Sequence, residues 1–259
     1  MKRANPTGTY LYCVVAAARR PRLTRVPAGL PGAGQVRLLD VEDGLFMAVA
    51  DLPLDRYSES AINKGLGDLD WVSRIAIAHE KVVESFITST AVLPMKLFTI
   101  FTTDDRALDH VRARRARIAS LVRRVANHQE WGIRVVLDRT LAAALSKKKV
   151  ATRSNSGISY LRQKKAQRDA ATQLASRARD TVADLFDRLA ARAGDAKRRA
   201  ASELPVQGGP LLLDAAFLVA RSRSGQFRAL VGRQSKALAS HGYQILLSGP
   251  WPPYTFISD

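Results

Sequence analysis

The pair His79-Glu80 is one candidate whose residue types and spacing suggest metal-dependent catalysis. A zinc-protease helix carries two histidines four residues apart, with a glutamate beside the first as general base. Val83 stands where the second histidine is needed, and no cluster of Cys, His or carboxylate residues at ligand spacing accompanies the pair. The sequence therefore predicts no metal site, and His79 is interpreted as a structural helix residue.

Three glycines, Gly29, Gly32 and Gly34, form the next candidate, because glycine-rich loops bind phosphate in nucleotide-binding proteins. They precede a strand-like segment, whereas a phosphate loop follows a strand and opens a helix, and no Gly-Lys-Ser/Thr sequence occurs. No serine has glycines at the two-residue offsets of a nucleophile elbow. We expect neither a nucleotide cofactor nor a serine nucleophile.

The acidic residues Asp51, Asp55, Asp68 and Asp70 could serve as catalytic acids, but surface turns and helix caps explain all four. The sequence thus predicts no catalytic residues, no cofactor and no enzymatic activity. Enzymes can assemble sites from residues far apart in the chain, so the residues alone leave an enzyme open.

A dense series of basic residues marks a candidate interaction surface. Its members lie on predicted helices: Arg112, Arg115, Arg123, Arg124, Lys164, Lys165 and Arg168. With a net charge of +18, such a stripe could neutralise nucleic-acid phosphates or attract an acidic protein surface. No aromatic stacking platform or recognition helix accompanies it, so nucleic-acid binding is the less favoured alternative and solvated helix faces are the plainer interpretation.

The first half of the chain alternates strand-like and helix-like patterns. Aromatic and β-branched runs predict strands at residues 9–15, 36–39, 45–50, 92–101 and 131–137, with Asp43-Gly44 turning a hairpin. Asp70 is expected to cap a helix with one buried stripe at Trp71, Ile75, Ala78, Val82 and Phe86, and a second helix is expected over residues 103–127. Pro94 must interrupt its strand at an edge or bulge. We expect an N-terminal mixed α/β domain over residues 1–138.

The second half begins with a polar, basic segment at residues 147–157, which is predicted to be a linker. One long helix, or two in succession, is expected over residues 157–193, followed by a strand, a helix and a strand at residues 211–220, 225–240 and 243–247. This pattern is βαβ-like or ferredoxin-like. The predicted fold class is therefore α+β with two domains, the second over residues 139–259.

The apolar runs and the number of cysteines indicate where in the cell the protein is expected. No apolar run approaches the roughly 20 residues that span a bilayer, and the N-terminal stretch lacks a signal-peptide cleavage pattern. The single cysteine, Cys13, excludes an internal disulfide and is expected in the core of a strand. We expect a cytoplasmic protein without a membrane span.

Six segments, in order along nearly the whole chain, resemble the gas vesicle protein F/L family. They are Tyr10 to Val15, Asp70-Trp71 through His79-Glu80, Val92-Leu93-Pro94-Met95-Lys96, Glu130-Trp131-Gly132, Gly157-Ile158-Ser159-Tyr160-Leu161, and the tail Ser248-Gly249-Pro250-Trp251-Pro252-Pro253-Tyr254-Thr255-Phe256. The chain departs from the family at Leu97-Phe98, where glycine commonly follows the aromatic residue, and at Cys13, where glycine is common.

The resemblance implies a two-domain α+β protein whose second domain is a modified ferredoxin-like unit. It also implies a non-enzymatic accessory role in gas vesicle assembly, with the major shell protein and other accessory proteins as partners and self-association possible. Exposed strand edges and basic helix faces could then hold shell subunits before they join the wall. The Trp251–Tyr254 tail is interpreted as a structural clamp docked on the protein, with a partner-binding motif as the alternative.

Overall fold

The computed structural model describes residues 6–24, 26–138, 157–200 and 209–257, and these form two compact units. Unit 1 comprises Met1–Gln129 together with Trp251–Asp259, and unit 2 comprises Glu130–Pro250. The predicted boundary after residue 138 does not coincide with this division. It falls elsewhere because the strand that starts at His128 pairs within the sheet of unit 2, and because the C-terminal tail belongs to unit 1.

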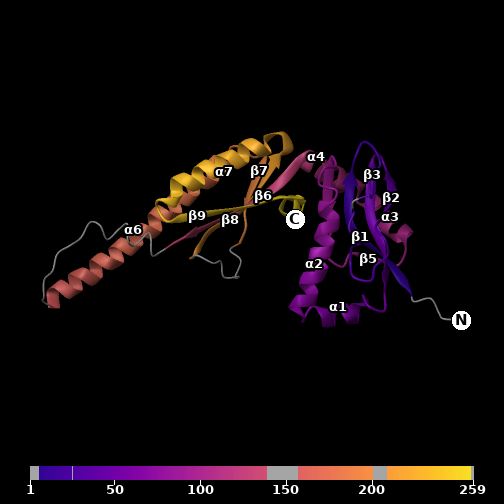
Figure 1. The fold of residues 1–259 in the computed structure, drawn as a ribbon, viewed down its shortest axis with the longest axis horizontal. Coiled ribbons are helices and arrows are strands. Elements are labelled where there is room, and N and C mark those ends of the chain that lie inside the picture. Colours follow the sequence, from indigo (N-terminus) through magenta and orange to yellow (C-terminus); the bar gives the residue numbers. More distant parts are fainter. Residues whose placement is uncertain (1–5, 25, 139–156, 201–208, 258–259) are drawn as a thin grey trace. The chain divides into compact units, whose positions relative to one another are not determined.

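Unit 1 is built on an antiparallel sheet whose central strand is almost completely buried (Figure 1). Its strands are β1 (Thr7–Ala16), β2 (Arg37–Glu42), β3 (Leu45–Pro53) and β4 (Ala91–Pro94), in the order β2-β3-β1-β4, with β5 (Ile100–Phe101) also paired to β1. Asp43 and Gly44 both have positive φ, 51° and 72°, as a tight hairpin turn requires. The predicted β2–β3 hairpin is confirmed.

The strand predicted over residues 92–101 is two strands, β4 and β5, which pair with successive parts of β1. Pro94 ends the first, opposite Cys13. In the connection, Phe98 has φ 63°, a conformation that favours glycine. Its ring stacks on Trp71 at 5.6 Å between centroids, which offsets the backbone strain and explains how a residue other than glycine is tolerated.

The helices described in unit 1 are α1 (Glu59–Gly65), α2 (Leu69–Glu84), α3 (Asp104–Ala113), α4 (Arg115–Val125) and α8 (Tyr254–Ile257). Asp68, and not the predicted Asp70 two residues later, caps α2 by accepting from the main-chain N–H groups of Asp70 and Trp71. Thr103 caps α3 as predicted. The single helix expected over residues 103–127 is divided, because Arg114 leaves helical geometry at φ −106° and ψ 15°.

In its described residues, unit 2 combines a four-stranded sheet with the helices α6 and α7. Its elements are β6 (His128–Leu137), α6 (Gly157–Ala190), β7 (Asp195–Arg198), β8 (Leu211–Ala220), the 3-10 turn η1 (Arg221–Arg223), α7 (Ser224–Ala239) and β9 (Tyr243–Trp251). The strand order is β7-β8-β6-β9. Residues 147–156 of the predicted linker lie outside the described residues, and Gly157 begins α6.

Each unit has its own apolar core. Unit 1 packs β1 and β3 against α2, through side chains such as Tyr10, Ala48, Ile75 and Phe86. In unit 2, alternate residues of β6 and β8 meet Val182 and Leu185 of α6 and Phe227 and Val231 of α7, so both helices pack on the same face of the sheet. Within the described ranges, no helix is long and apolar enough to cross a membrane.

Candidate functional site

Three residues from the predicted signature segments form a buried polar cluster in unit 1. The hydroxyl of Tyr10 lies 2.8 Å from Nδ1 of His79, and the hydroxyl of Tyr12 accepts a hydrogen bond of 3.0 Å from the main-chain N–H of Leu30. The rings of Tyr10 and Tyr12 meet edge to face with centroids 4.7 Å apart. Tyr10, Tyr12 and His79, here called the tyrosine–histidine cluster, thus join β1 to α2 inside the core.

Burial lowers the pKa of His79 from 6.5 to about 4 and raises the pKa of Tyr10. Both side chains are therefore neutral near pH 7. A neutral imidazole hydrogen-bonded to a tyrosine inside an apolar core serves to orient α2 on the sheet. This geometry agrees with the structural interpretation of His79.

The pH dependence of unfolding should report on His79. Because its pKa is about 4 in the folded protein and near 6.5 unfolded, the unfolded chain binds the proton first as the pH falls, so this contribution to stability is complete above about pH 6.5 and is lost toward pH 4. We expect the free energy of unfolding to drop by about 2 kcal/mol from pH 7 to pH 5. Urea unfolding at a series of pH values would measure it.

The matched variant is His79→Gln, which retains a polar side chain but does not titrate. Its free energy of unfolding should vary less between pH 7 and pH 5, with a residual slope from His110, whose pKa is also lowered by burial. Equal slopes in the two proteins would show that His79 is not protonated on unfolding in this range.

The C-terminal signature lies against unit 1. Pro252 and Pro253 are buried, and Phe256 is fully buried in α8, which contacts β4. Burial raises the pKa of Tyr254, and the carboxylates of Glu80 and Glu84 add to this rise, so the tail lies close to α2. The structure thus brings the tail together with the His79-Glu80 and Pro94 segments, as a clamp requires, while Trp251 remains 39% exposed.

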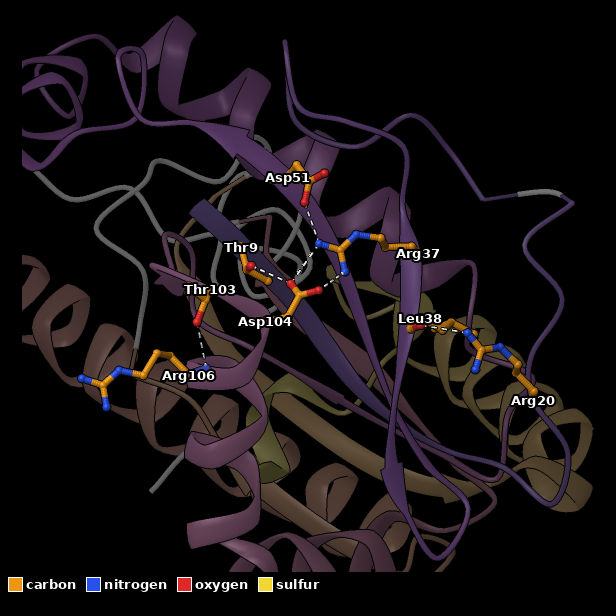
Figure 2. A network of polar contacts seen from close by, with 8 residues as sticks. All are labelled: Thr9, Arg20, Arg37, Leu38, Asp51, Thr103, Asp104 and Arg106. Carbon is orange, nitrogen blue, oxygen red and sulfur yellow. Dashed lines mark hydrogen bonds and ion pairs between the residues drawn. The ribbon is translucent and has the colours of Figure 1, made fainter. Parts of the chain in front are cut away.

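A polar network that the sequence did not suggest fixes α3 to the sheet of unit 1 (Figure 2). Arg37 on β2 donates to both carboxylate oxygens of Asp104 at 2.7 and 2.9 Å, and to Asp51 on β3 at 2.6 Å. Thr9 on β1 donates to Asp104 at 2.7 Å. The hydrogen bonds from Arg37 lower the pKa of Asp104, which also stands in the first turn of α3, where negative charge is favoured.

The segment Glu130-Trp131-Gly132 contributes to a buried ionic network in unit 2. Arg199 lies 2.6 Å from Asp214 and 3.6 Å from Glu130, and both carboxylate side chains are only 4% exposed. A Cβ on Gly132 would lie 2.5 Å from Oγ of Ser248 and 3.3 Å from Nη2 of Arg199, so glycine leaves room for the arginine. Trp131 is buried and donates from Nε1 to Ser224 at 3.4 Å. Tyr160 is part of α6, but its side chain lies outside the described residues.

The predicted basic surface is distributed over both units. Arg112 and Arg115 form ion pairs with Glu42 at 4.0 and 3.6 Å, and Arg115 also pairs with Asp43. Arg123 and Arg124 lie exposed in the last turn of α4, whereas the remaining members are exposed on α6 in unit 2: Lys164, Lys165 and Arg168. Four of these residues lie in unit 1 and three lie in unit 2. A single surface formed by all seven therefore stays a prediction.

The described side chains of these clusters are placed to hold elements together. Among the described residues, no three His, Cys, Asp or Glu side chains lie together as a metal site requires. Cys13 is free and buried, and burial raises the pKa of its thiol, so its sulfur is protonated and shielded. The buried contacts of the signature residues hold together a framework that leaves the exposed surfaces free to bind partners.

Solved structures identify the class to which this fold belongs. The chain is similar to the crystal structure of the gas vesicle protein GvpF from Anabaena sp. PCC7120, with a TM-score of 0.69 and 18% identity over 98% of this chain and 97% of that one. It is similar to GvpF from Microcystis aeruginosa with a TM-score of 0.67 and 18% identity over 97% and 99% of the two chains. The chain therefore has the mixed α and β fold of these proteins.

Sequence comparisons give the family. The sequence model described as gas vesicle synthesis protein GvpL/GvpF matches residues 8–258. Gas vesicle protein L from Streptomyces sp. (strain CB03234) is 31% identical over 252 residues, which cover 95% of this chain and 91% of the relative. Gas vesicle protein F from the same strain is 29% identical over 260 residues, 96% of this chain and 99% of the relative. The chain belongs to the GvpL/GvpF family of gas vesicle synthesis proteins, and its role is in gas vesicle formation.

Proposed function

We propose that this protein is a non-enzymatic accessory factor that binds the major shell protein and other accessory gas vesicle proteins and nucleates or chaperones formation of the shell. The observation that carries the proposal is the family match, which extends over residues 8–258 and so includes both units and the tail. The buried signature clusters support it, because they build a scaffold and leave partner binding to exposed surfaces.

Exposed apolar side chains and strand edges provide surfaces for such a partner. Leu66, Leu69 and Ile77 are 53%, 79% and 50% exposed on and between α1 and α2. The strand β2 stands at one end of the described strand order of unit 1 and is only partly buried, whereas β4 at the other end is buried and is contacted by α8. Unpaired strand edges and apolar side chains can both hold a partner that is prone to aggregate, by strand addition and by burial of apolar area.

Deletion of the coding sequence tests the role. We expect cells that lack this protein to make no gas vesicles while still producing the major shell protein, and a plasmid copy to restore them. Vesicle counts by electron microscopy and immunoblots for the shell protein would measure both. Normal vesicles in the deletion strain would contradict an essential accessory role and would direct attention to the nucleic-acid alternative that the charge of +18 permits.

A retention experiment separates shell binding from an indirect effect. The immobilised protein should retain the major shell protein at low salt, and a charge-matched unrelated protein should not. Absence of retention would contradict direct binding even if the deletion strain lacks vesicles. Cell fractionation in the same strain would test the proposed location in the cytoplasm and on the vesicle.

We further infer that the two units are separate domains and that unit 2 is a modified ferredoxin-like domain. The order of its elements is β-α-β-β-α-β, and two helices pack on one face of an antiparallel sheet, which supports this assignment. The 34-residue length of α6 is the principal modification.

A further inference from the structure

A cavity of about 680 Å³ lies in unit 2, lined by residues of α7, by Arg223 of η1 and by Arg192 in the turn that follows α6. One stripe of α7 lines it, since Gln226, Phe227, Leu230 and Arg233 recur at helical spacing, and Arg223 continues this stripe from η1 just before α7. Arg192 lines it from the end of α6, where its main-chain N–H donates to Leu189 at 3.0 Å. The cavity is thus formed by a regular helix and an anchored turn.

The charge of this cavity is not neutralised by the residues around it. Arg192, Arg223 and Arg233 are all exposed, and none of the lining residues is acidic. In the part of the chain that the structure describes, no carboxylate forms an ion pair with any of these three arginines. This contrasts with Arg37, Arg115 and Arg199, each of which pairs with an aspartate.

The lining combines these guanidinium groups with an apolar floor. Phe227 is 1% exposed and belongs to the core of unit 2, and Leu230 is half-buried beside it. Guanidinium groups bind carboxylates through paired N–H donors, and an apolar floor favours a ligand that also carries aliphatic side chains. The complementary ligand is therefore both acidic and apolar.

These properties favour a peptide segment over a nucleic acid or a small anion. The buried ring of Phe227 cannot stack on a base, so the cavity lacks the aromatic platform of a single-strand binder. Small-molecule sites enclose their ligand in mostly apolar walls with few polar groups, whereas here the three charged groups are exposed. A helix that presents carboxylates on one face and leucines beside them would match both the exposed arginines and the floor.

We propose that this three-arginine cavity, defined by Arg192, Arg223, Arg233, Phe227 and Leu230, binds an acidic amphipathic segment of a protein partner. The proposal rests on the proposed function in one respect only: the partner is expected among the proteins of vesicle assembly. Binding of a defined peptide to the purified protein tests the cavity directly, so its failure would be distinct from failure of the deletion or retention experiments.

The probe is a fluorescein-labelled helical peptide with glutamates on one face and leucines on the adjoining face, and its affinity is measured by anisotropy at about 0.15 M ionic strength. The cavity variant carries Arg192→Gln, Arg223→Gln and Arg233→Gln. The control loses the same charge elsewhere, through Arg106→Gln, Arg177→Gln and Arg179→Gln, at exposed positions on α3 and α6. Circular dichroism verifies that both variants are folded.

We expect the cavity variant to bind the peptide at least about ten-fold more weakly, and the control to stay within about two-fold of the native protein. Peptides with Glu→Gln or with Leu→Ser should both bind more weakly to the native protein. Equal losses in the two variants would overturn the proposal, since they would indicate attraction to the overall charge. Competition with a single-stranded oligonucleotide or ATP is the other decisive result. If either displaces the peptide from the native protein, and if its own affinity falls in the cavity variant as much as that of the peptide, the proposal is overturned in favour of a phosphate site.

A single charge reversal provides a second test if the triple variant does not fold. Arg233→Glu should weaken the acidic peptide and strengthen binding of its counterpart in which lysines replace the glutamates. If both peptides respond in the same direction, the cavity is not the binding site.

Discussion

Replacement of Phe256 by alanine is expected to lower the free energy of unfolding by about 3–5 kcal/mol, the usual cost of emptying a fully buried phenylalanine site. Phe256 is 0% exposed and belongs to α8, which contacts β4 of unit 1. The preceding Pro252 and Pro253 are buried too, so little of the segment can rearrange to fill the space. Urea unfolding followed by far-UV circular dichroism would measure the loss, with two transitions fitted if the units unfold separately.

Two variants bracket this prediction. Phe256→Leu retains most of the apolar volume and should cost less than about 1.5 kcal/mol. Leu69→Ala removes an apolar side chain that is 79% exposed in the same unit and should cost less than about 0.5 kcal/mol. If Phe256→Ala proved as mild as Leu69→Ala, the tail would not clamp unit 1, and a partner-binding role for the Trp-Pro-Pro-Tyr segment would become the better interpretation.

The second large effect is expected in unit 2, from Arg199→Met. Methionine retains most of the aliphatic volume but removes the charge that lies 2.6 Å from Asp214 and 3.6 Å from Glu130. Because those two side chains are 4% exposed, each would keep a buried negative charge with fewer compensating partners. We expect a loss of about 3 kcal/mol at pH 7, at the lower end for a broken buried ion pair, since Arg199 itself is one-third exposed.

Neutralising the acids provides the control. In the triple variant Arg199→Met, Glu130→Gln, Asp214→Asn the buried charges are gone, so part of the lost stability should return. No recovery would mean that Arg199→Met acts through packing or through its other contacts, such as the hydrogen bond to the main-chain oxygen of Ala215.

The elements that the sequence predicted well are those encoded by local periodicity. Aromatic and β-branched residues identified β1, an apolar run identified β8, the Asp43-Gly44 pair identified the hairpin, and spacings of three and four identified the stripe of α2. These signals depend on neighbours in the chain, which is why they can be recognised without knowledge of the tertiary structure.

The errors have tertiary causes. The strand at 128–137 follows α4 closely along the chain, but its pairing partners β8 and β9 come more than seventy residues later, so nothing local in the sequence indicates that the compact units divide at residues 129 and 130. The polar strand β7 (Asp195–Arg198) was missed because an edge strand is held by hydrogen bonds to β8 and has little apolar pattern of its own. The break between α3 and α4 depends on the backbone conformation of Arg114, and Phe98 with its positive φ lies in the connection that separates β4 from β5.

The candidate sites were predictable only in part. The signature residues were identified from the sequence, and the structure adds that those of unit 1 meet around the tyrosine–histidine cluster and the tail. The charged network of Arg37, Asp51 and Asp104 could not be recognised from the sequence. These three residues are distant in the chain, and each has an ordinary explanation as a surface charge. The three-arginine cavity was missed for the same reason, since its arginines lie among many others on basic helices.

The position of the tail has a consequence for biosynthesis. A ribosome makes residues 1–129 first, then all of unit 2, and only afterwards the Pro252–Phe256 segment that lies against β4. The first unit to be translated is thus the last to receive its full set of core residues, although domains generally fold in the order in which they emerge. Unit 2 is an insertion between two parts of unit 1, and completion of the N-terminal core is coupled to translation of all of unit 2.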